Sequence, residues 1–120
     1  MKIVLVAEDN EAVQRLLTRS IMRAGFHVIT VESGDRAWNS VRVLCPFALI
    51  TDIQLKGMSG LELLRRCRSH DELRTIKVAV ISGDVTNIPE AGIDADVVFE
   101  KPFDMHQIVN WLEGFNGGNK

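Results

Sequence analysis

The stretch ALITDIQLKGMSG, residues 48–60, begins as a predicted buried strand and then has a charged residue at the end of that strand. The run FALI at 47–50 is apolar throughout, as expected for a strand that is covered on both faces. The run leads to Asp52, and the loop that follows contains Gly57 and Gly60. A carboxylate at the tip of a buried strand is held rigidly, so we expect it to serve a purpose other than solubility.

Apolar runs alternate with amphipathic segments along the chain, with neither a long linker nor a repeat. This alternation is typical of α/β proteins that contain a parallel sheet. Five strands are predicted, at residues 2–7, 27–31, 47–51, 77–82 and 96–100. We therefore expect a doubly wound five-stranded parallel sheet, flavodoxin-like with strand order 2-1-3-4-5, and helices on both of its faces.

Four amphipathic segments predict helices between and after these strands. A residue typical of a helix end marks each one: Gly25 closes the first, and Ser33, Ser59 and Asp104 precede the others. The segment 83–95 is different, because it contains Pro89 and several turn-forming residues. Only one short or irregular helix is expected there.

Composition limits the class of protein. The 120 residues suffice for one domain, which we expect at residues 1–115, with 116–120 as a frayed tail or the start of a linker. A net charge of −2 gives no support for nucleic acid or a membrane surface as a partner. Cys45 and Cys67 lack zinc-like spacing, which favours reduced, partly buried thiols. No stretch resembles a signal peptide or a membrane span, so a cytoplasmic location is expected.

Five polar side chains follow the predicted strands, and in this fold the carboxyl ends of the strands share one crevice. They are Glu8 and Asp9 after the first strand, Asp52 after the third, Ser82 at the end of the fourth and Lys101 after the fifth. Three adjacent carboxylates repel one another unless a cation lies among them, and Mg²⁺ suits such a site. The set fits phosphoryl transfer, with Asp52 as nucleophile and with Lys101 and Ser82 contacting phosphoryl oxygens.

Each of these residues alone has a simpler interpretation. A Glu8-Asp9 pair before a helix is more often a helix cap, Ser82 before glycine is more often a turn residue, and Lys101 is more often solvated. Asp52 is the exception, because the next predicted helix begins only at Ser59. The conjunction of all five, in the right order in one fold, favours the functional interpretation.

These residues resemble the signature of the response regulator receiver domain, the CheY-like phosphoacceptor module of two-component signalling. The resemblance covers essentially the whole chain and rests on four motifs: AEDN at 7–10, TDIQLKGMSG at 51–60, ISG at 81–83 and EKPF at 100–103. It implies a module that assists its own phosphorylation and dephosphorylation and is not an enzyme acting on other substrates. Its partners would be a sensor histidine kinase or histidine phosphotransfer protein, and an output domain or downstream protein.

The resemblance also implies roles for individual residues. Asp52 would accept a phosphoryl group from a phosphohistidine. Mg²⁺ would be held by Asp9, by Asp52 and by the backbone carbonyl of Gln54, with Glu8 acting mainly through water. Ser82 would move toward the phosphoryl group and Lys101 would pair with it, next to a Lys-Pro bond that this family often holds in cis.

The chain departs from the family pattern at several positions. Glu8 replaces the commoner aspartate, and Lys56 stands where the loop usually has proline. Val98 occupies a position, three before the lysine, where receivers usually have an aromatic ring that swings inward, and Phe99 should point to the opposite face of the strand. The segment between the fourth and fifth strands is also short. We therefore expect normal phosphorylation chemistry and an atypical route for the signal.

Three other classes remain as alternatives. A Mg²⁺-dependent aspartyl-phosphate phosphatase or phosphotransferase of the haloacid dehalogenase type needs a second aspartate two residues after the first, where this chain has Gln54. A degenerate receiver that never takes phosphate is disfavoured by the complete set of acidic residues, serine and lysine. A flavin-binding protein is disfavoured because no phosphate-cradling loop follows the first strand.

Overall fold

The computed structural model describes residues 2–83 and 94–117. It contains one five-stranded parallel sheet in the order β2-β1-β3-β4-β5, which confirms the predicted topology. The strands are β1 (Ile3–Ala7), β2 (His27–Val31), β3 (Ala48–Asp52), β4 (Lys77–Ser82) and β5 (Val97–Glu100). Each predicted strand agrees with the observed one to within one residue at either end. The third extends one residue further than predicted, so that Asp52 itself pairs with Ile81.

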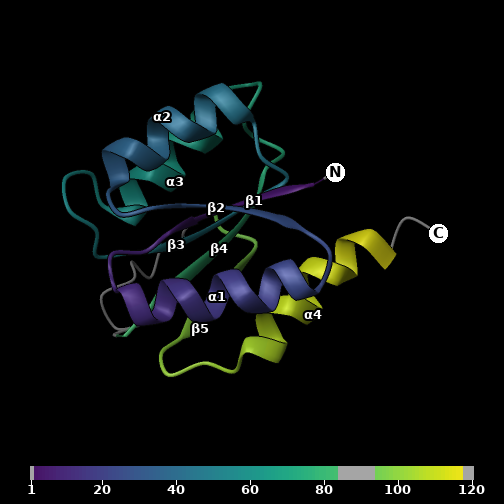
Figure 1. Cartoon of the computed structure of the whole chain (residues 1–120). Helices are drawn as coiled ribbons and strands as arrows, with labels where there is room; N and C mark the ends of the chain where they lie inside the picture. The colour runs from purple at the N-terminus through teal and green to yellow at the C-terminus, as the bar shows by residue number, and fades with distance from the viewer. Residues whose placement is uncertain (1, 84–93, 118–120) are drawn as a thin grey trace.

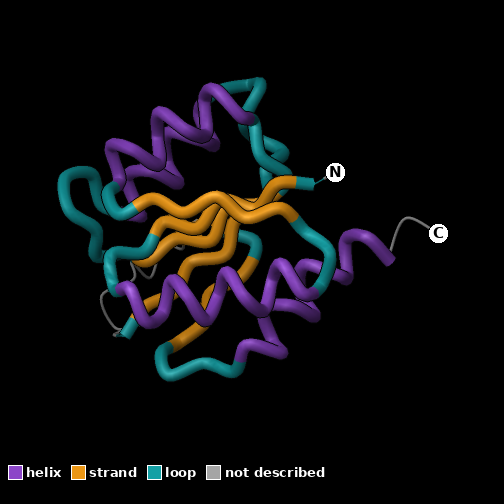
Figure 2. The backbone as a smooth tube through the Cα atoms, viewed as in Figure 1, coloured by secondary structure: helices purple, strands orange, loops and turns teal. Residues whose placement is uncertain are grey.

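Helices cover both faces of the sheet (Figure 1). They are α1 (Glu11–Arg23), α2 (Gly34–Leu44), α3 (Gly60–Ser69) and α4 (Met105–Gly117). α2 and α3 lie on one face, and α1 and α4 lie on the other (Figures 1 and 2). None of the helices in the described residues has the length and apolar character needed to cross a membrane.

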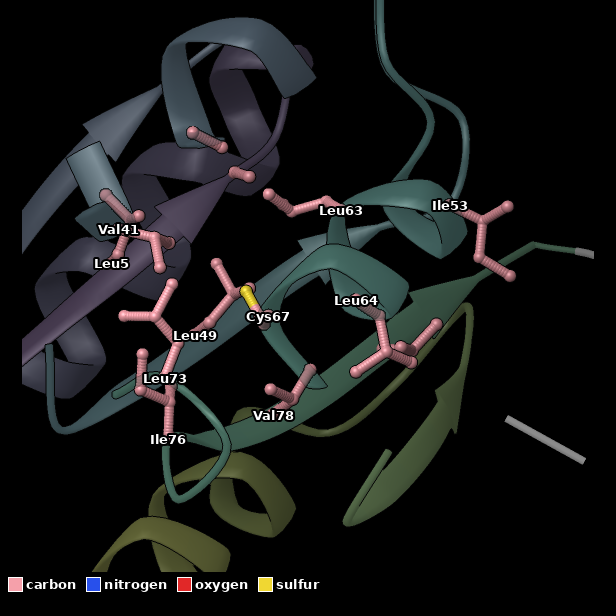
Figure 3. Packing of buried hydrophobic residues seen from close by; sticks show 13 residues of the cluster. Leu5, Val41, Leu49, Ile53, Leu63, Leu64, Cys67, Leu73, Ile76 and Val78 are labelled. Atoms are coloured by element: carbon pink, nitrogen blue, oxygen red, sulfur yellow. The ribbon is translucent and has the colours of Figure 1, made fainter. Parts of the chain in front are cut away.

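The sheet has a separate hydrophobic core on each face. Leu5, Leu49 and Val78 pack with Val41 of α2 and Leu63 of α3 (Figure 3). On the other face, strand residues join helix residues: Val6, Ile50 and Ile81 pack with Leu17 of α1 and Leu112 of α4. Because neighbouring residues of a strand point to opposite faces, β3 must be apolar at every position to serve both cores.

The helix ends follow the predicted chemistry. Gly25, with φ of 100°, ends α1 in a Schellman motif, in which its N–H donates to Met22 and that of Phe26 donates to Ile21. The hydroxyls of Ser33 and Ser59 accept from the third residue beyond them, as caps of α2 and α3. At the start of α4, the Asp104 carboxylate accepts from the N–H of His106, and its carbonyl accepts from that of Gln107.

Two further expectations concern the segment 83–95 and the two cysteines. The short helix expected within 83–95 falls on residues 84–93, which lie outside the described part of the chain. Both cysteines are free, as predicted, but neither is partly buried. Cys67 lies in the core, where burial raises the pKa of its thiol to about 11. Cys45 is exposed and follows α2 in an αL conformation.

Arg68 joins α3 to the sheet edge opposite the predicted site. Its guanidinium donates to the carbonyls of Arg74, Ile76 and Asp94 and to the Asp96 carboxylate, at 2.7 to 3.0 Å. The same carboxylate oxygen accepts from the N–H of Val78 on β4. Because this side chain is only 13% exposed, its hydrogen bonds are largely shielded from water.

Replacing Arg68 by alanine should lower the free energy of unfolding by about 2–3 kcal/mol, since it leaves several acceptors without a donor. Urea unfolding at neutral pH measures this change. Arg74→Ala is the matched control, because that side chain is 62% exposed and its ion pair within the described residues is with the exposed Asp71, so its removal should have far less effect. Equal losses for the two variants would contradict this role of Arg68.

Candidate functional site

The predicted site residues lie at the carboxyl edge of the sheet. Glu8 and Asp9 follow β1, Asp52 ends β3, Ser82 ends β4 and Lys101 follows β5. Glu8 is fully buried, Asp52 is 7% exposed and Asp9 is exposed. The edge therefore has two shielded carboxylates beside one that faces solvent.

Lys101 connects two of the carboxylates directly. Its Nζ donates to Oε1 of Glu8 at 3.1 Å and to Oδ2 of Asp52 at 2.7 Å. Burial acts to lower the pKa of Lys101, but the hydrogen bonds and negative charges of both partners outweigh it and raise the pKa above its ordinary value. The lysine is thus held as an ammonium in contact with the predicted nucleophile. The Lys101-Pro102 peptide bond is cis, as the family resemblance implied.

Glu8, Asp9 and Asp52 form an acidic cluster. One carboxylate oxygen from each lies within 4.8 Å of the others. Two full negative charges at that separation repel by about 3 kcal/mol at an effective dielectric constant of about 20. One ammonium cannot neutralise three carboxylates, so the cluster has the excess negative charge and the hard oxygen donors that suit Mg²⁺.

Glu8 is fixed by hydrogen bonds to both of its carboxylate oxygens and to its carbonyl, besides the one that its N–H donates to Val31. Its Oε1 accepts from Lys101, its Oε2 accepts from the N–H of Asn10 at 3.0 Å, and its carbonyl accepts from Nε2 of Gln14 at 3.0 Å. Burial raises the pKa of Glu8 above its ordinary value, against the hydrogen bonds from Asn10 and Lys101, and the charge of Asp52 raises it further. With both carboxylate oxygens already accepting hydrogen bonds, Glu8 is less available than Asp9 for direct coordination.

Asn10 and Gln14 were not among the predicted site residues. Asn10 caps α1, since its side chain accepts from the N–H of Val13 at 3.1 Å. This cap was detectable in the sequence, because asparagine directly before an amphipathic run is a typical N-cap. The interaction of Gln14 with Glu8 had no comparable local signal, as it depends on where α1 packs.

Backbone hydrogen bonds position the Asp52 carboxylate and the neighbouring strand ends. Oδ1 of Asp52 accepts from the N–H of Gln54 at 3.1 Å, and Oδ2 is the oxygen that contacts Lys101. The carbonyl of Ser82 accepts from the N–H of Lys101 at 2.7 Å, so the ends of β4 and β5 are joined beside the cluster. Ser82 is 6% exposed. The site thus has a positioned carboxylate and an ammonium, with a buried hydroxyl-bearing residue at the neighbouring strand end.

The side chains of Val98 and Phe99 point to opposite faces of β5, as predicted. Val98 is 37% exposed, whereas Phe99 is partly buried against the core beneath α1 and α4. Phe99 therefore does not replace the missing ring at position 98, because the pleat directs it to the other face.

Comparison with known proteins identifies the family. A model of the response regulator receiver domain matches residues 4–113. Response regulator receiver protein CpdR of Brucella abortus is 34% identical over 117 residues, covering 94% of this chain and 95% of that protein. Polar-differentiation response regulator DivK of Brucella anthropi is 30% identical over 121 residues, covering 97% of each. The chain belongs to the response regulator receiver domain family of two-component signal transduction.

Solved structures share the fold. The CheY-like receiver domain from Methylobacillus flagellatus has a TM-score of 0.83 and 24% identity, covering 95% of this chain and 98% of that one. The receiver domain of sensor histidine kinase PA1611 from Pseudomonas aeruginosa has a TM-score of 0.87 and 19% identity, covering 97% and 98%. In the latter protein a magnesium ion is coordinated in the active site cleft.

The buried state of Glu8 predicts a pH dependence. Its pKa is raised in the folded state, so its contribution to stability is present below the unfolded value of about 4.3 and is lost as the pH rises through the folded value. Glu8→Gln removes this titration. The free energy of unfolding of the variant, minus that of the parent, should therefore increase as the pH rises from about 4.3 to neutrality.

Urea unfolding in EDTA between acid and neutral pH measures this difference. The slope of this difference against pH is informative even if the amide fits the site poorly. A poor fit would lower the free energy of unfolding of the variant by the same amount at every pH. Glu113→Gln, on the exposed surface of α4, is the matched control for the change in net charge. A difference for Glu8→Gln that stays constant or falls with pH would contradict the burial effect.

Proposed function

We propose that this receiver domain is an active phosphoacceptor, in which Asp52 takes a phosphoryl group from a phosphohistidine in a Mg²⁺-dependent reaction. The observation that carries the proposal is the position of the Asp52 carboxylate, at the tip of a buried strand, within hydrogen-bond distance of Lys101 and inside an acidic cluster. A degenerate receiver has no need of this combination.

The metal ligands in this proposal are Asp9, Asp52 and the backbone carbonyl of Gln54. Glu8 acts through water, as the family resemblance implies. When bound, Mg²⁺ supplies positive charge that offsets the repulsion among the carboxylates and between Asp52 and the incoming phosphoryl group. The exposed Asp9 gives the ion a route from solvent.

The chain's own residues perform the transfer. A carboxylate oxygen of Asp52 forms a bond to phosphorus as the bond from phosphorus to the histidine nitrogen breaks, and the electron pair of the broken bond stays with the imidazole. Lys101, already in contact with Asp52, then donates to a phosphoryl oxygen. Ser82 provides a hydroxyl for a second phosphoryl oxygen.

The biological setting follows from this chemistry. The phosphodonor is a sensor histidine kinase or histidine phosphotransfer protein, and the signal passes to an output domain or downstream protein. We assign the receiver domain to residues 1–115, with the remainder as a tail or linker, although α4 itself continues to Gly117. The domain is proposed to act in the cytoplasm, and not as an enzyme on other substrates.

Treatment with acetyl phosphate and Mg²⁺ should add one phosphoryl group to the protein, measured by intact mass spectrometry. EDTA should abolish the gain, because the carboxylate cluster then repels the donor. Asp52→Asn should not gain mass, whereas Glu113→Gln should behave as the parent. No gain on the parent, or an equal gain on Asp52→Asn, would refute the proposal. Repeated turnover of phosphoesters without a stable phosphoprotein would favour the phosphatase alternative.

The conformational response is proposed to bypass residue 98, where valine replaces the usual aromatic ring. Val98→Tyr tests this, because it supplies a ring at a position that is 37% exposed. Phosphorylation should change amide hydrogen exchange across residues 94–100 more strongly in Val98→Tyr than in the parent. If the parent responds as strongly as the variant, the idea of an atypical route is wrong.

A further inference from the structure

We propose that the corner between β2 and α2, residues Ser33–Asp35, positions the metal-binding loop that follows Asp52. The loop comprises residues 53–59 and contains Gln54. This inference rests on the proposed function and goes beyond it, since residues 33–35 are not among the proposed metal ligands or phosphoryl contacts. They would act through the loop, as positioning residues.

The corner and the loop are joined through their backbones. The N–H of Gly34 donates to the carbonyl of Lys56 at 3.0 Å, and Ser33 and Lys56 form an isolated parallel β-bridge. Gly34 is also the first residue of α2, with the Ser33 hydroxyl accepting from the N–H of Arg36 at 3.2 Å. The start of α2 is therefore fixed to the loop and to its own cap at the same point.

Two glycines allow this close approach. A Cβ at Gly34 would overlap the carbonyl oxygen of Met58, which is backbone and cannot move without the loop. Gly57 has φ of 72°, and a Cβ there would overlap the carboxylate of Asp35. The loop thus fits against the corner at two points, and at each of them the glycine has no room for a side chain of its own.

The base of the loop is held from the other side. The N–H of Gly60 donates to the carbonyl of Ile53 at 2.8 Å, and the N–H of Ile53 donates to the carbonyl of Ile81 on β4 at 3.2 Å. Gln54 lies between this base and the tip held by the corner, and its N–H donates to Oδ1 of Asp52. The position of the Gln54 carbonyl therefore depends on both attachments.

The loop cannot rely on its own stiffness, because Lys56 replaces the proline that is usual there. A ligand carbonyl that is misplaced binds metal less well, and loss of residues that orient ligands typically weakens metal affinity by about 10–100-fold. Coupling between two sites is reciprocal, so Mg²⁺ bound at the loop should also tighten the Gly34–Lys56 contact. Through α2, the binding of Mg²⁺ at the site then affects the surface formed by α2 and α3.

Gly34→Ala should raise the dissociation constant for Mg²⁺ by at least about tenfold, because the added methyl group displaces the loop through Met58. Calorimetric titration with MgCl₂ measures this, and urea unfolding in EDTA measures the stability of each variant. Gly114→Ala is the matched control, since a Cβ there meets nothing within 4 Å, and its Mg²⁺ affinity should equal that of the parent.

A second variant keeps the test informative if Gly34→Ala does not fold. Asp35→Ala removes only the side chain that packs against Gly57 and should weaken Mg²⁺ binding about two- to fivefold, less than the loss of a complete orienting contact. In the parent, Mg²⁺ should also shift the glycine amide NMR signals of Gly34, Gly57 and Gly60, while those of Gly25 and Gly114 stay in place.

The outcomes separate the two proposals. If the parent does not bind Mg²⁺ or take phosphate, the proposed function fails. If the parent and Gly114→Ala bind Mg²⁺ and the corner variants bind it equally well, only the positioning role is wrong. Lower stability in EDTA with unchanged Mg²⁺ affinity would likewise overturn the role, because it would make the corner a purely structural contact.

Discussion

The contact on which the site depends is the one between the ammonium of Lys101 and the carboxylates of Glu8 and Asp52. These partners are 93 and 49 positions from the lysine in the chain. They meet because the strands are parallel, so that the carboxyl ends of β1, β3 and β5 lie on one edge of the sheet. The contact leaves the cluster of three carboxylates only partly neutralised. This residual negative charge suits a divalent cation, whereas the ammonium of Lys101 suits the oxygens of a transferred phosphoryl group.

The scaffold makes this arrangement rigid. β3 is buried on both faces and serves two separate cores, so Asp52 extends from the most enclosed strand of the sheet. Glu8 is enclosed as well, and donors from Asn10 and Lys101 only partly offset its unfavourable burial. Asp9 alone is open to solvent. The site therefore combines fixed groups with one exposed carboxylate, which is the proposed point of entry for the metal.

The loop after β3 links this site to α2. In a receiver with proline in the loop, the chain itself restricts the backbone. Here Lys56 removes that restriction, and the carbonyl of this residue accepts a hydrogen bond from the N–H of Gly34, the first residue of α2. Val98 stands on β5 where receivers usually have an aromatic ring. These two substitutions are the basis for the proposed route through α2.

The sequence by itself determined the elements and the identity of most site residues. Apolar runs set the five strands, Gly25, Ser33 and Ser59 set helix ends, and Glu8, Asp9, Asp52 and Lys101 were each recognisable at a strand end. These are local properties, which depend on periodicity and on the chemistry of single residues. Only the tertiary structure decided that Gln14 supports Glu8, that Arg68 joins α3 to the segments leading into β4 and β5, and that Gly34 meets Lys56. Such contacts join segments that are brought together by packing, and no local pattern encodes which atoms meet there.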